Sequence, residues 1–277
     1  MKKIKQIFYL GIKGSNSFLA ASLSAGNKVK LSGLASFEEI FRSVEKESSA
    51  AGILPLENSL SGSIYEIYDL LTDSKTFITA ETEVRINHAL MQKERTGLQK
   101  IRYCLSHPEV FRQCRRFFSD NPSIETVPVA DTASAAKMLK ELGPDTACVA
   151  NPAAAAVNNL RIKKEHLEDN RNNYSRFITV GRKLKQHGNK ISLMFNLKHV
   201  PGSLYKALSP YARLGLNLTK IESRPIPGRL WEYLFYVDFE LNNGKHGFDE
   251  IITAMKMLTK NLKVLGRYDK YDKIKNS

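Results

Sequence analysis

The sequence lacks any run of about 18 apolar residues, the length that a helix needs to cross a membrane. Near its start an alternating stretch from Ile4 to Leu10 takes the place of the apolar core of a secretory signal. Only three cysteines occur, and their wide spacing suits neither a disulfide framework nor a metal site: Cys104, Cys114 and Cys148. Each lies in an apolar context, as buried thiols do. We therefore expect a soluble, cytoplasmic protein in a reducing compartment.

Acidic residues are scarce as well, because 28 Asp and Glu stand against 42 Lys and Arg, for a formal net charge of +14. Basic patches are typical of nucleic-acid-binding proteins. Here the charge is dispersed, and no zinc-finger spacing, aromatic RNA-binding signature or basic low-complexity tail accompanies it. We therefore expect a lysine-rich solvated surface and no nucleic-acid or membrane partner. Nucleic-acid binding is kept as an alternative, which salt-dependent binding to random duplex DNA would support.

At 277 residues the chain is long enough for about two domains, at roughly 150 residues each. Up to about residue 182, short apolar strands alternate with amphipathic helices, which is typical of an α/β domain with substantially parallel strands. The predicted strands are Ile4 to Gly11, Ala51 to Leu56, Phe77 to Met91, Ile101 to Leu105, Ile124 to Val129, Thr146 to Ala150 and Arg176 to Val180. The predicted helices begin at Phe37, after a Ser36–Glu39 capping box, and at Ser63, Glu109, Thr132 and Pro152.

A polar, basic, glycine-containing segment from Gly181 to Lys190 predicts a linker between two domains. After it, the pattern predicts elements in the order βαββαβ, which is that of a ferredoxin-like module. We therefore expect a first domain at residues 1–182 and a second at 190–269.

Four motifs carry groups that suit a polar ligand. Asn172 to Phe177 sets a hydroxyl beside a guanidinium at the start of an apolar run. Pro55 to Leu60 and Ser106 to Glu109 each lie between a predicted strand and a helix, where α/β proteins often bind ligands. Asp131 to Ala136 opens a helix, whose free amide groups favour an anion. Together these motifs resemble the prephenate dehydratase family, in its monofunctional form with a C-terminal ACT regulatory domain.

The resemblance implies a two-lobed, periplasmic-binding-protein-like dehydratase domain followed by a βαββαβ ACT domain. It implies the conversion of prephenate to phenylpyruvate, with loss of water and carbon dioxide, in phenylalanine biosynthesis. That reaction needs a hydrogen-bond donor at the departing hydroxyl, and cations or amides at the pyruvyl end. It needs no metal, nucleophile or cofactor. Arogenate as the substrate, or an amino-acid sensor without turnover, are the alternatives.

Ser175 is the expected donor, because the family motif Thr-Arg-Phe is Ser175-Arg176-Phe177 here and keeps the hydroxyl. Arg176 is expected to clamp the pyruvyl carboxylate through its planar fork. Phe177, next on the strand, points to the opposite face and belongs to the core. By resemblance, the further substrate contacts are Asn58, Ser59, Ser106, Gln113 and Thr132. Capping is an alternative role for Asn58, and for the aspartate that precedes Thr132.

The turn from Gly11 to Phe18 matches the family least well. Ile12 stands in place of the usual proline, Asn16 in place of an aromatic residue and Phe18 in place of a polar one. The resemblance therefore does not predict the shape of this wall of the expected cleft.

The second module carries three further motifs of the resemblance, around Gly202, Asn217 and Glu222. By resemblance they bind phenylalanine between two ACT modules, through Gly202, Ser203, Leu204, Asn217, Leu218, Glu222 and Ser223. We expect a homodimer or homotetramer, with inhibition by phenylalanine. The alternating aromatic residues Trp231, Tyr233 and Phe235 predict one strand face that serves as module core or dimer surface.

Overall fold

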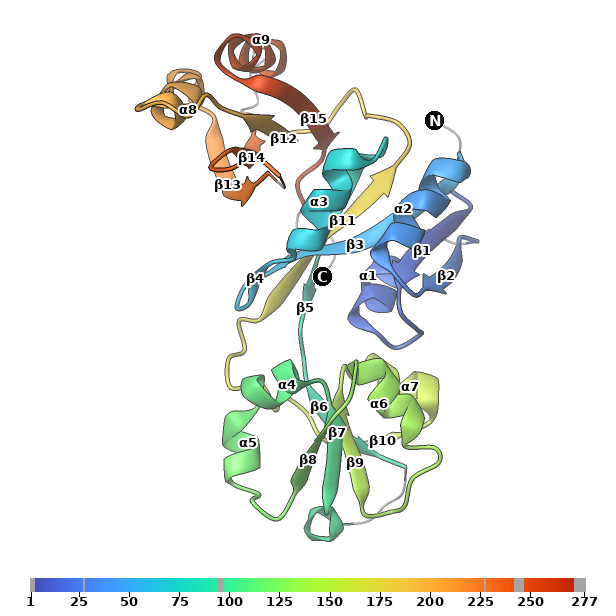
Figure 1. The fold of residues 1–277 in the computed structure, drawn as a ribbon. Coiled ribbons are helices and arrows are strands. Elements are labelled where there is room, and N and C mark those ends of the chain that lie inside the picture. Colours follow the sequence, from blue (N-terminus) through green and yellow to red (C-terminus); the bar gives the residue numbers. More distant parts are fainter. Residues whose placement is uncertain (1–2, 27, 94–96, 227, 242–246, 272–277) are drawn as a thin grey trace.

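The computed structural model describes residues 3–26, 28–93, 97–226, 228–241 and 247–271. It has a middle lobe, a lower lobe and an upper module, as Figure 1 shows. The chain passes from the middle lobe to the lower lobe through residues 86–88 and returns through residues 165–173. The two crossings lie side by side, because the backbone N–H of Ile86 donates to the carbonyl of Asn173 at 2.8 Å.

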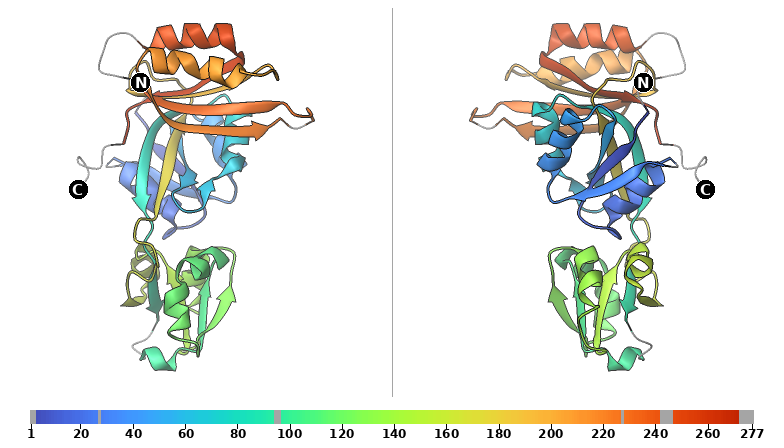
Figure 2. Two further views of the ribbon diagram at one scale, coloured as in Figure 1. Left: turned by 90° about the vertical axis from the view of Figure 1, so that its left-hand side faces the viewer. Right: turned by 90° about the vertical axis from the view of Figure 1, so that its right-hand side faces the viewer.

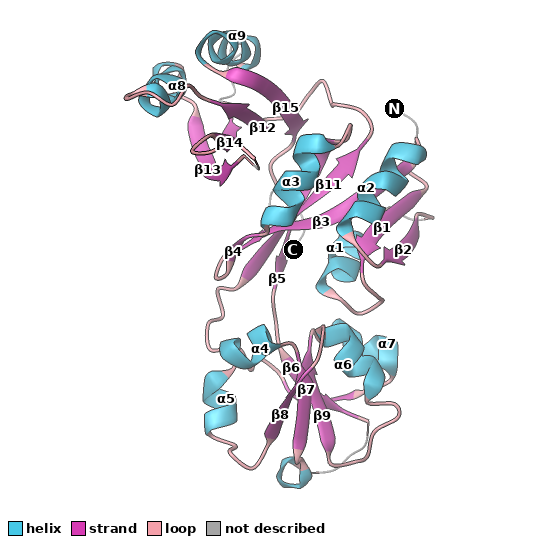
Figure 3. Cartoon of the chain, in the orientation of Figure 1, coloured by secondary structure: helices cyan, strands magenta, loops and turns pink. Residues whose placement is uncertain are grey.

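The middle lobe is a mixed sheet covered by helices (Figure 3). Its elements are β1 (Gln6–Leu10), α1 (Asn16–Ser24), β2 (Lys30–Leu34), α2 (Phe37–Lys46), β3 (Ala50–Asn58), β4 (Gly62–Ser63), α3 (Tyr65–Asp73), β5 (Phe77–Arg85) and β11 (Tyr174–Gly181). Strand β1 pairs in parallel with β2 and β3, while β11 runs antiparallel between β3 and β5. The predicted cap of α2 is confirmed, since Ser36 Oγ accepts a hydrogen bond from the backbone N–H of Glu39 at 3.2 Å.

The lower lobe has its own sheet, in the order β10-β6-β9-β7-β8. Its elements are β6 (Ala89–Gln92), the 3₁₀ helix η1 (Leu98–Lys100), β7 (Tyr103–Ser106), α4 (Pro108–Gln113), α5 (Arg115–Ser119), β8 (Glu125–Pro128), α6 (Thr132–Met138), β9 (Thr146–Ala150), α7 (Ala153–Asn158) and β10 (Arg161–Lys164). All three cysteines are free and buried, as expected. Burial raises the pKa of Cys104 to about 12, so this thiol stays protonated and unreactive.

Two predicted elements of this region are wrong. The single strand predicted from Phe77 to Met91 is two strands in two sheets, because the chain leaves the middle lobe after β5. The single helix predicted from Glu109 to Phe118 is α4 followed by α5, because Cys114 departs from helical geometry with φ −119° and ψ 31°.

No helix of the described residues is both long and apolar enough to span a membrane.

The upper module has the predicted order βαββαβ. Its elements are β12 (Lys190–Asn196), α8 (Ser203–Arg213), β13 (Asn217–Pro225), β14 (Tyr233–Glu240), α9 (Phe248–Leu258) and β15 (Lys260–Tyr268). Helices α8 and α9 cover one face of its sheet, and the other face is turned toward the middle lobe (Figure 2).

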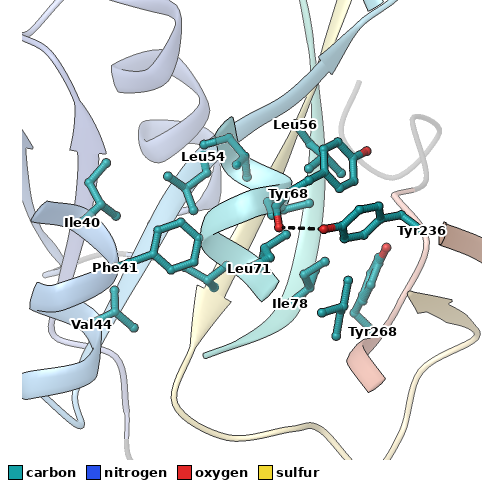
Figure 4. Packing of buried hydrophobic residues seen from close by; sticks show 14 of the residues in the cluster. Ile40, Phe41, Val44, Leu54, Leu56, Tyr68, Leu71, Ile78, Tyr236 and Tyr268 are labelled. Carbon is teal, nitrogen blue, oxygen red and sulfur yellow. Dashed lines mark hydrogen bonds between the residues drawn. The ribbon is translucent and has the colours of Figure 1, made fainter. Parts of the chain in front are cut away.

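The upper and middle sheets are joined into one sheet by a parallel contact of β15 with β5, at Gly266 and Ile78. A Cβ atom at position 266 would lie 2.4 Å from the carbonyl oxygen of Ile78, so only glycine allows this approach. Helix α3 lies against both parts, and Figure 4 shows Tyr68 of α3 beside Tyr236 of β14. The Tyr236 hydroxyl donates to the Tyr68 carbonyl at 3.2 Å, so the apolar core continues from one part into the other.

Candidate functional site

The residues around Ser175 lie where strands β11 and β3 reach the lower lobe. Ser175 and Asn58 are register partners, and Asn58 Nδ2 donates to Ser175 Oγ at 3.1 Å. The same nitrogen donates to Asn173 Oδ1 at 2.6 Å. On its other side, Asn58 Oδ1 accepts the backbone N–H groups of Leu60 and Ser61, at 2.9 and 3.0 Å. Both ends of the Asn58 side chain are thus used by the protein, and it fixes the Ser175 hydroxyl.

The Ser175 hydroxyl is left with a hydrogen to donate. Its oxygen accepts from Asn58, and its own hydrogen has no acceptor among the described residues. A serine hydroxyl carries one hydrogen beside its acceptor positions. Because the side chain is only partly buried, a ligand between the lobes can receive that hydrogen bond.

Gln113 joins this group from the lower lobe. Its Oε1 accepts from Asn173 Nδ2 at 3.1 Å and lies 2.7 Å from His88 Nε2. Its Nε2 donates to Glu109 Oε1 at 3.1 Å. The predicted residues Ser175, Asn58 and Gln113 are therefore brought together, with fully buried Asn173 as the link.

Sequence reasoning missed His88 and the specific role of Asn173. His88 falls within a stretch that predicts one continuous strand, and it is 3% exposed. A polar residue among apolar neighbours in such a stretch is the signal that could have found it. Asn173 belongs to a recognised motif, but only the fold shows that it lies between Asn58 and Gln113.

Arg176 points away from Ser175, to the opposite face of the sheet, and is 8% exposed. Its guanidinium donates to Glu81 Oε2 at 2.8 Å, Glu57 Oε1 at 3.0 Å, Asp238 Oδ2 at 2.6 Å and the Tyr268 hydroxyl at 2.9 Å. The expectation that it clamps a substrate carboxylate is corrected by this geometry, because the protein already supplies three carboxylates to it. Phe177 is buried in the apolar cluster that contains Tyr9, in agreement with its predicted place in the core.

The carboxylates of the cluster around Arg176 have further cations beside them. Lys190 binds Glu81 at 2.8 Å, and Lys220 binds Glu57 and also Glu222, at 3.7 Å. Burial alone would raise the pKa of Asp238, but Arg176, Ser192 and Lys190 together outweigh it and hold that pKa below its usual value. Asp238 comes from the upper module, so the cluster ties that module to β11.

Three other predicted contacts have different surroundings. Ser59 Oγ accepts from the backbone N–H of Tyr174 at 2.9 Å and donates to the carbonyl of Asn172 at 3.1 Å, so it holds the second crossing. Ser106 is fully buried and donates to the carbonyl of Val149 at 2.7 Å. Burial of Ser106 corrects its expected role as a substrate contact, whereas Ser59 is exposed and its expected role stays a prediction.

Thr132 is compatible with a ligand. It is partly exposed at the start of α6, and its hydroxyl has no partner among the described residues. The cap of that helix is Asp131, whose carboxylate accepts from the backbone N–H of Ser134 at 2.8 Å. The capping role at this turn therefore belongs to Asp131, and the ligand contact of Thr132 stays a prediction.

The poorly matching turn after β1 reaches across to the lower lobe. Asn151 Nδ2 donates to Asn16 Oδ1 at 2.6 Å. Gly14 has φ +93°, and a Cβ atom there would lie 3.0 Å from the Cα of Ala154. The turn therefore forms one wall between the lobes, and Asn16 is its contact with the far side.

The upper module has a hollow of about 380 Å³ beside α8. Ser203 and Leu204 line it, and Gly202, with φ +80°, precedes the helix. The aromatic residues Trp231, Tyr233 and Phe235 line it too. The predicted strand over them is partly wrong, because β14 begins at Tyr233 and Trp231 stands before it, 71% exposed.

The other expected effector residues lie on β13, outside the lining of this hollow. Asn217 and Ser223 are exposed, and Leu218 packs partly against the module core. Glu222 faces the middle lobe, where its Oε2 accepts from Ser63 Oγ at 2.7 Å. In the single chain, β13 therefore contacts the middle lobe with one face and leaves the other open.

Comparison with known proteins gives one consistent family. The family model described as prephenate dehydratase matches residues 7–185. The prephenate dehydratase of Methanocaldococcus jannaschii is 35% identical over 244 residues, which cover 86% of this chain and 87% of that protein. The structure of prephenate dehydratase from Arthrobacter aurescens in complex with L-Phe superposes with a TM-score of 0.86 at 25% identity, covering 96% and 90% of the two chains. A structure described as GqqA, a novel type of quorum quenching acylase, superposes with a TM-score of 0.87 at 28% identity, covering 98% and 99%.

Proposed function

Because the chain belongs to the prephenate dehydratase family, we propose that it converts prephenate to phenylpyruvate between its middle and lower lobes. The observation that carries this placement is the Ser175 hydroxyl, which is fixed by Asn58 and keeps a hydrogen to donate. It lies beside Gln113, from the opposite lobe, through the Asn173 link.

In the proposed reaction the ring carboxylate leaves as carbon dioxide, and its bonding electrons form the aromatic ring as the ring C–O bond breaks. The departing hydroxyl oxygen leaves as hydroxide, which accepts the hydrogen bond of Ser175 and becomes water by taking a proton from solvent. A neutral serine is a weak acid, so it stabilises the departing oxygen rather than ionising. Asn58 is a positioning residue, because it sets the direction of that hydroxyl. Gln113 and Thr132 are the proposed contacts for the remaining substrate oxygens.

The surroundings of Ser175 do not favour acyl transfer, the chemistry of the quorum quenching neighbour's description. A nucleophilic serine needs a general base within hydrogen-bond reach. The side-chain partner of Ser175 Oγ among the described residues is an amide, and His88 Nε2 is directed at Gln113 instead. Dehydration needs no general base at Ser175, because the hydroxyl acts there only as a hydrogen-bond donor.

We propose residues 1–182 as the catalytic domain with two lobes, and residues 190–269 as the ACT regulatory domain. The two chain crossings between separate sheets support periplasmic-binding-protein-like lobes. The order βαββαβ supports the ACT assignment. The three free, buried cysteines suit a reducing compartment and support a cytoplasmic location.

We propose that phenylalanine binds beside the hollow at α8, through Gly202, Ser203 and Leu204. The L-Phe complex of the Arthrobacter aurescens neighbour supports an effector of this kind. Exposed apolar side chains line the hollow, among them Trp231 at 71% and Val200 at 59%. A second copy would cover them and could bring Asn217, Leu218 and Ser223 to the ligand, which supports a homodimer or homotetramer. Glu222 is proposed to dock the module on the middle lobe instead.

The test is turnover by the purified chain on prephenate and on arogenate, the alternative substrate. We expect phenylpyruvate absorbance to appear with prephenate, and to decrease when phenylalanine is added. Absence of product from both compounds across neutral pH would leave the amino-acid sensor as the function. If phenylalanine forms from arogenate faster than phenylpyruvate forms from prephenate, arogenate is the substrate.

A further inference from the structure

We propose that His88 is a positioning residue for this reaction, as a neutral imidazole with its hydrogen on Nε2. In this form it holds the Gln113 amide oxygen toward Asn173 and leaves one N–H of that amide for a ligand. The inference rests on the proposed function, because Gln113 acts there as a substrate contact. His88 does not contact Ser175 and acts only through Gln113.

The direction of every hydrogen bond in this chain of amides follows from two backbone groups. The N–H groups of Leu60 and Ser61 can only donate, and both face Asn58 Oδ1. The other end of the Asn58 side chain is therefore nitrogen, and it donates to Asn173 Oδ1. Hydrogen-bond networks of this kind are the means by which amide orientation is assigned.

The same reasoning continues to the imidazole. With its oxygen facing Asn58, Asn173 presents its nitrogen to Gln113, so the atom that receives it is Gln113 Oε1. An oxygen that already accepts needs a donor in its other contact as well. His88 Nε2, at 2.7 Å, must therefore carry a hydrogen. Gln113 Nε2 then faces Glu109 with one hydrogen, and its second hydrogen has no partner among the described residues.

The other imidazole nitrogen keeps the ring neutral. His88 Nδ1 is buried and has no partner among the described residues. Protonation there would bury an N–H group without an acceptor, which is unfavourable because the group loses its hydrogen bond to water. Burial lowers the pKa of His88, and this outweighs the opposite influences of Gln113 and Glu168.

The charged groups around His88 have other partners. Glu168 comes from the second crossing, and its Oε2 accepts the backbone N–H of His88 at 2.9 Å. Its Oε1 lies 3.3 Å from His166 Nδ1. Glu109, on α4, is bound to Gln113 and Arg112. Asp169 accepts from the backbone N–H of Arg116 at 3.2 Å. Their carboxylates thus leave Nδ1 without an acceptor.

The position of His88 gives the contact its importance. It lies in the first crossing, Asn173 lies in the second, and Gln113 lies in the lower lobe. All three meet at one amide oxygen, so the contact fixes how the lower lobe presents Gln113 to the Ser175 site.

Nitrogen-15 NMR of the wild-type chain tests the tautomer without any assay of activity. We expect His88 at pH 7 to be neutral with its hydrogen on Nε2, and to remain neutral when the pH falls below about 6.5, the usual histidine value. A hydrogen on Nδ1, or an imidazolium ring at pH 7, would overturn the proposal.

Kinetics test the positioning role. His88→Leu removes the donor, and we expect kcat/KM for prephenate to fall about 10- to 100-fold, mainly through KM, because Gln113 binds the substrate. His88→Gln carries an amide nitrogen to a similar position, and we expect it to restore most of the loss. His166→Asn is the control, because it changes a histidine of the neighbouring second crossing that contacts Glu168 and not Gln113. We expect it to keep wild-type kinetics.

Wild-type kcat/KM in folded His88→Leu would overturn the positioning role, and so would a loss that His88→Gln leaves unrepaired. If His88→Leu does not fold, the NMR experiment and His88→Gln still decide, since loss of activity in folded His88→Gln contradicts the proposal. Failure of the proposed function is distinct, because the wild-type chain itself would then form no phenylpyruvate.

Discussion

The two faces of strand β11 differ sharply in how their polar groups are used. On one face, the Ser175 hydroxyl accepts from Asn58 and keeps a hydrogen without an acceptor in the described part of the chain. On the other face, the Arg176 guanidinium donates to three carboxylates and to the hydroxyl of Tyr268. Neighbours in the sequence thus meet opposite surroundings.

The difference shows that adjacent residues of one motif can have different roles, one toward a ligand and one within the fold. A group that binds substrate must keep a donor or acceptor free, whereas a buried charge is stable only when its partners satisfy it. Ser175 meets the first condition, and Arg176 meets the second. The geometry therefore makes Arg176 a structural anchor and leaves Ser175 as the residue of the pair that we propose as the catalytic donor.

The largest expected effect comes from Arg176→Met. It leaves the buried carboxylates of Glu81 and Asp238, and the partly buried one of Glu57, with fewer cations. Removal of one partner from a buried ion pair costs about 3 to 5 kcal/mol. We expect the free energy of unfolding, measured by urea denaturation, to fall by that amount.

The matched control for this change is Arg224→Met. Arg224 binds Asp69 at 2.7 Å between the same two parts of the molecule, but the Asp69 side chain is 54% exposed. Pairs of that kind contribute about 0 to 1 kcal/mol. Equal losses in the two variants would show that the Arg176 cluster is not a special anchor.

The next effect concerns the open face. Ser175→Ala removes a preorganised donor, which typically costs about 2.7 to 4 kcal/mol of activation energy, or about a 100- to 1000-fold loss in kcat. We expect the free energy of unfolding to change by less than about 1.5 kcal/mol, because Asn58 keeps its other partners. Steady-state kinetics on prephenate and urea denaturation measure the two quantities.

Ser175→Thr is the control for this change, because it retains the hydroxyl and adds only a methyl group. We expect turnover close to that of the wild type. Near-normal kcat in the alanine variant would remove Ser175 from the mechanism, and a large loss of stability would erase the contrast with Arg176.

The local pattern of the sequence is enough to predict the main features of this region. Short apolar runs predict β3 and β11, and the motifs predict that Ser175, Asn58 and Gln113 belong to one site. The order of the upper module also follows from pattern alone. Helix α1 is missed, because its polar positions are serines whose hydroxyls bond back to the helix, as Ser22 does to the carbonyl of Phe18 at 2.8 Å.

What the pattern cannot supply is contact between distant segments. The partner Asp238 stands 62 residues from Arg176, in a separate module, and no local signal joins them. The break between β5 and β6 is hidden for a similar reason. Ile86 and His88 are buried in the first crossing, as residues within a strand would be. The apolar pattern of the sequence therefore continues from β5 into β6 and does not reveal the change of sheet.

A smaller effect is expected at the junction that brings Asp238 to Arg176. Gly266→Ala would place a Cβ atom 2.4 Å from the Ile78 carbonyl oxygen, and backbone cannot move aside easily. Overpacking of this kind typically costs about 1 to 3 kcal/mol. We expect a lower melting temperature and faster proteolysis in residues 182–189, the segment between the two parts.

Gly97→Ala is the control for the junction, because the nearest atom to its added Cβ is a flexible side-chain atom of Gln99 at 3.6 Å. We expect no comparable change in that variant. If Gly266→Ala keeps the wild-type melting temperature and protease resistance, the joined sheet does not hold the upper module in place.

The smallest effect is a change in pH dependence that only the Arg176 face should show. Burial alone would raise the pKa of Asp238, but Arg176 and Ser192 hold it below its usual value of about 3.9. A lowered pKa in the folded state gives stability that is fully present above the unfolded value and is lost as the pH falls through the folded value. In Asp238→Asn this contribution is absent, so its stability at pH 7 is lower but falls less steeply in acid, by up to about 1.4 kcal/mol per pH unit.

Ser175→Ala should keep the wild-type slope, because that face loses no titrating group. Urea denaturation below about pH 4 measures both slopes. Parallel curves for wild type and Asp238→Asn would mean that Arg176 does not hold Asp238 ionised.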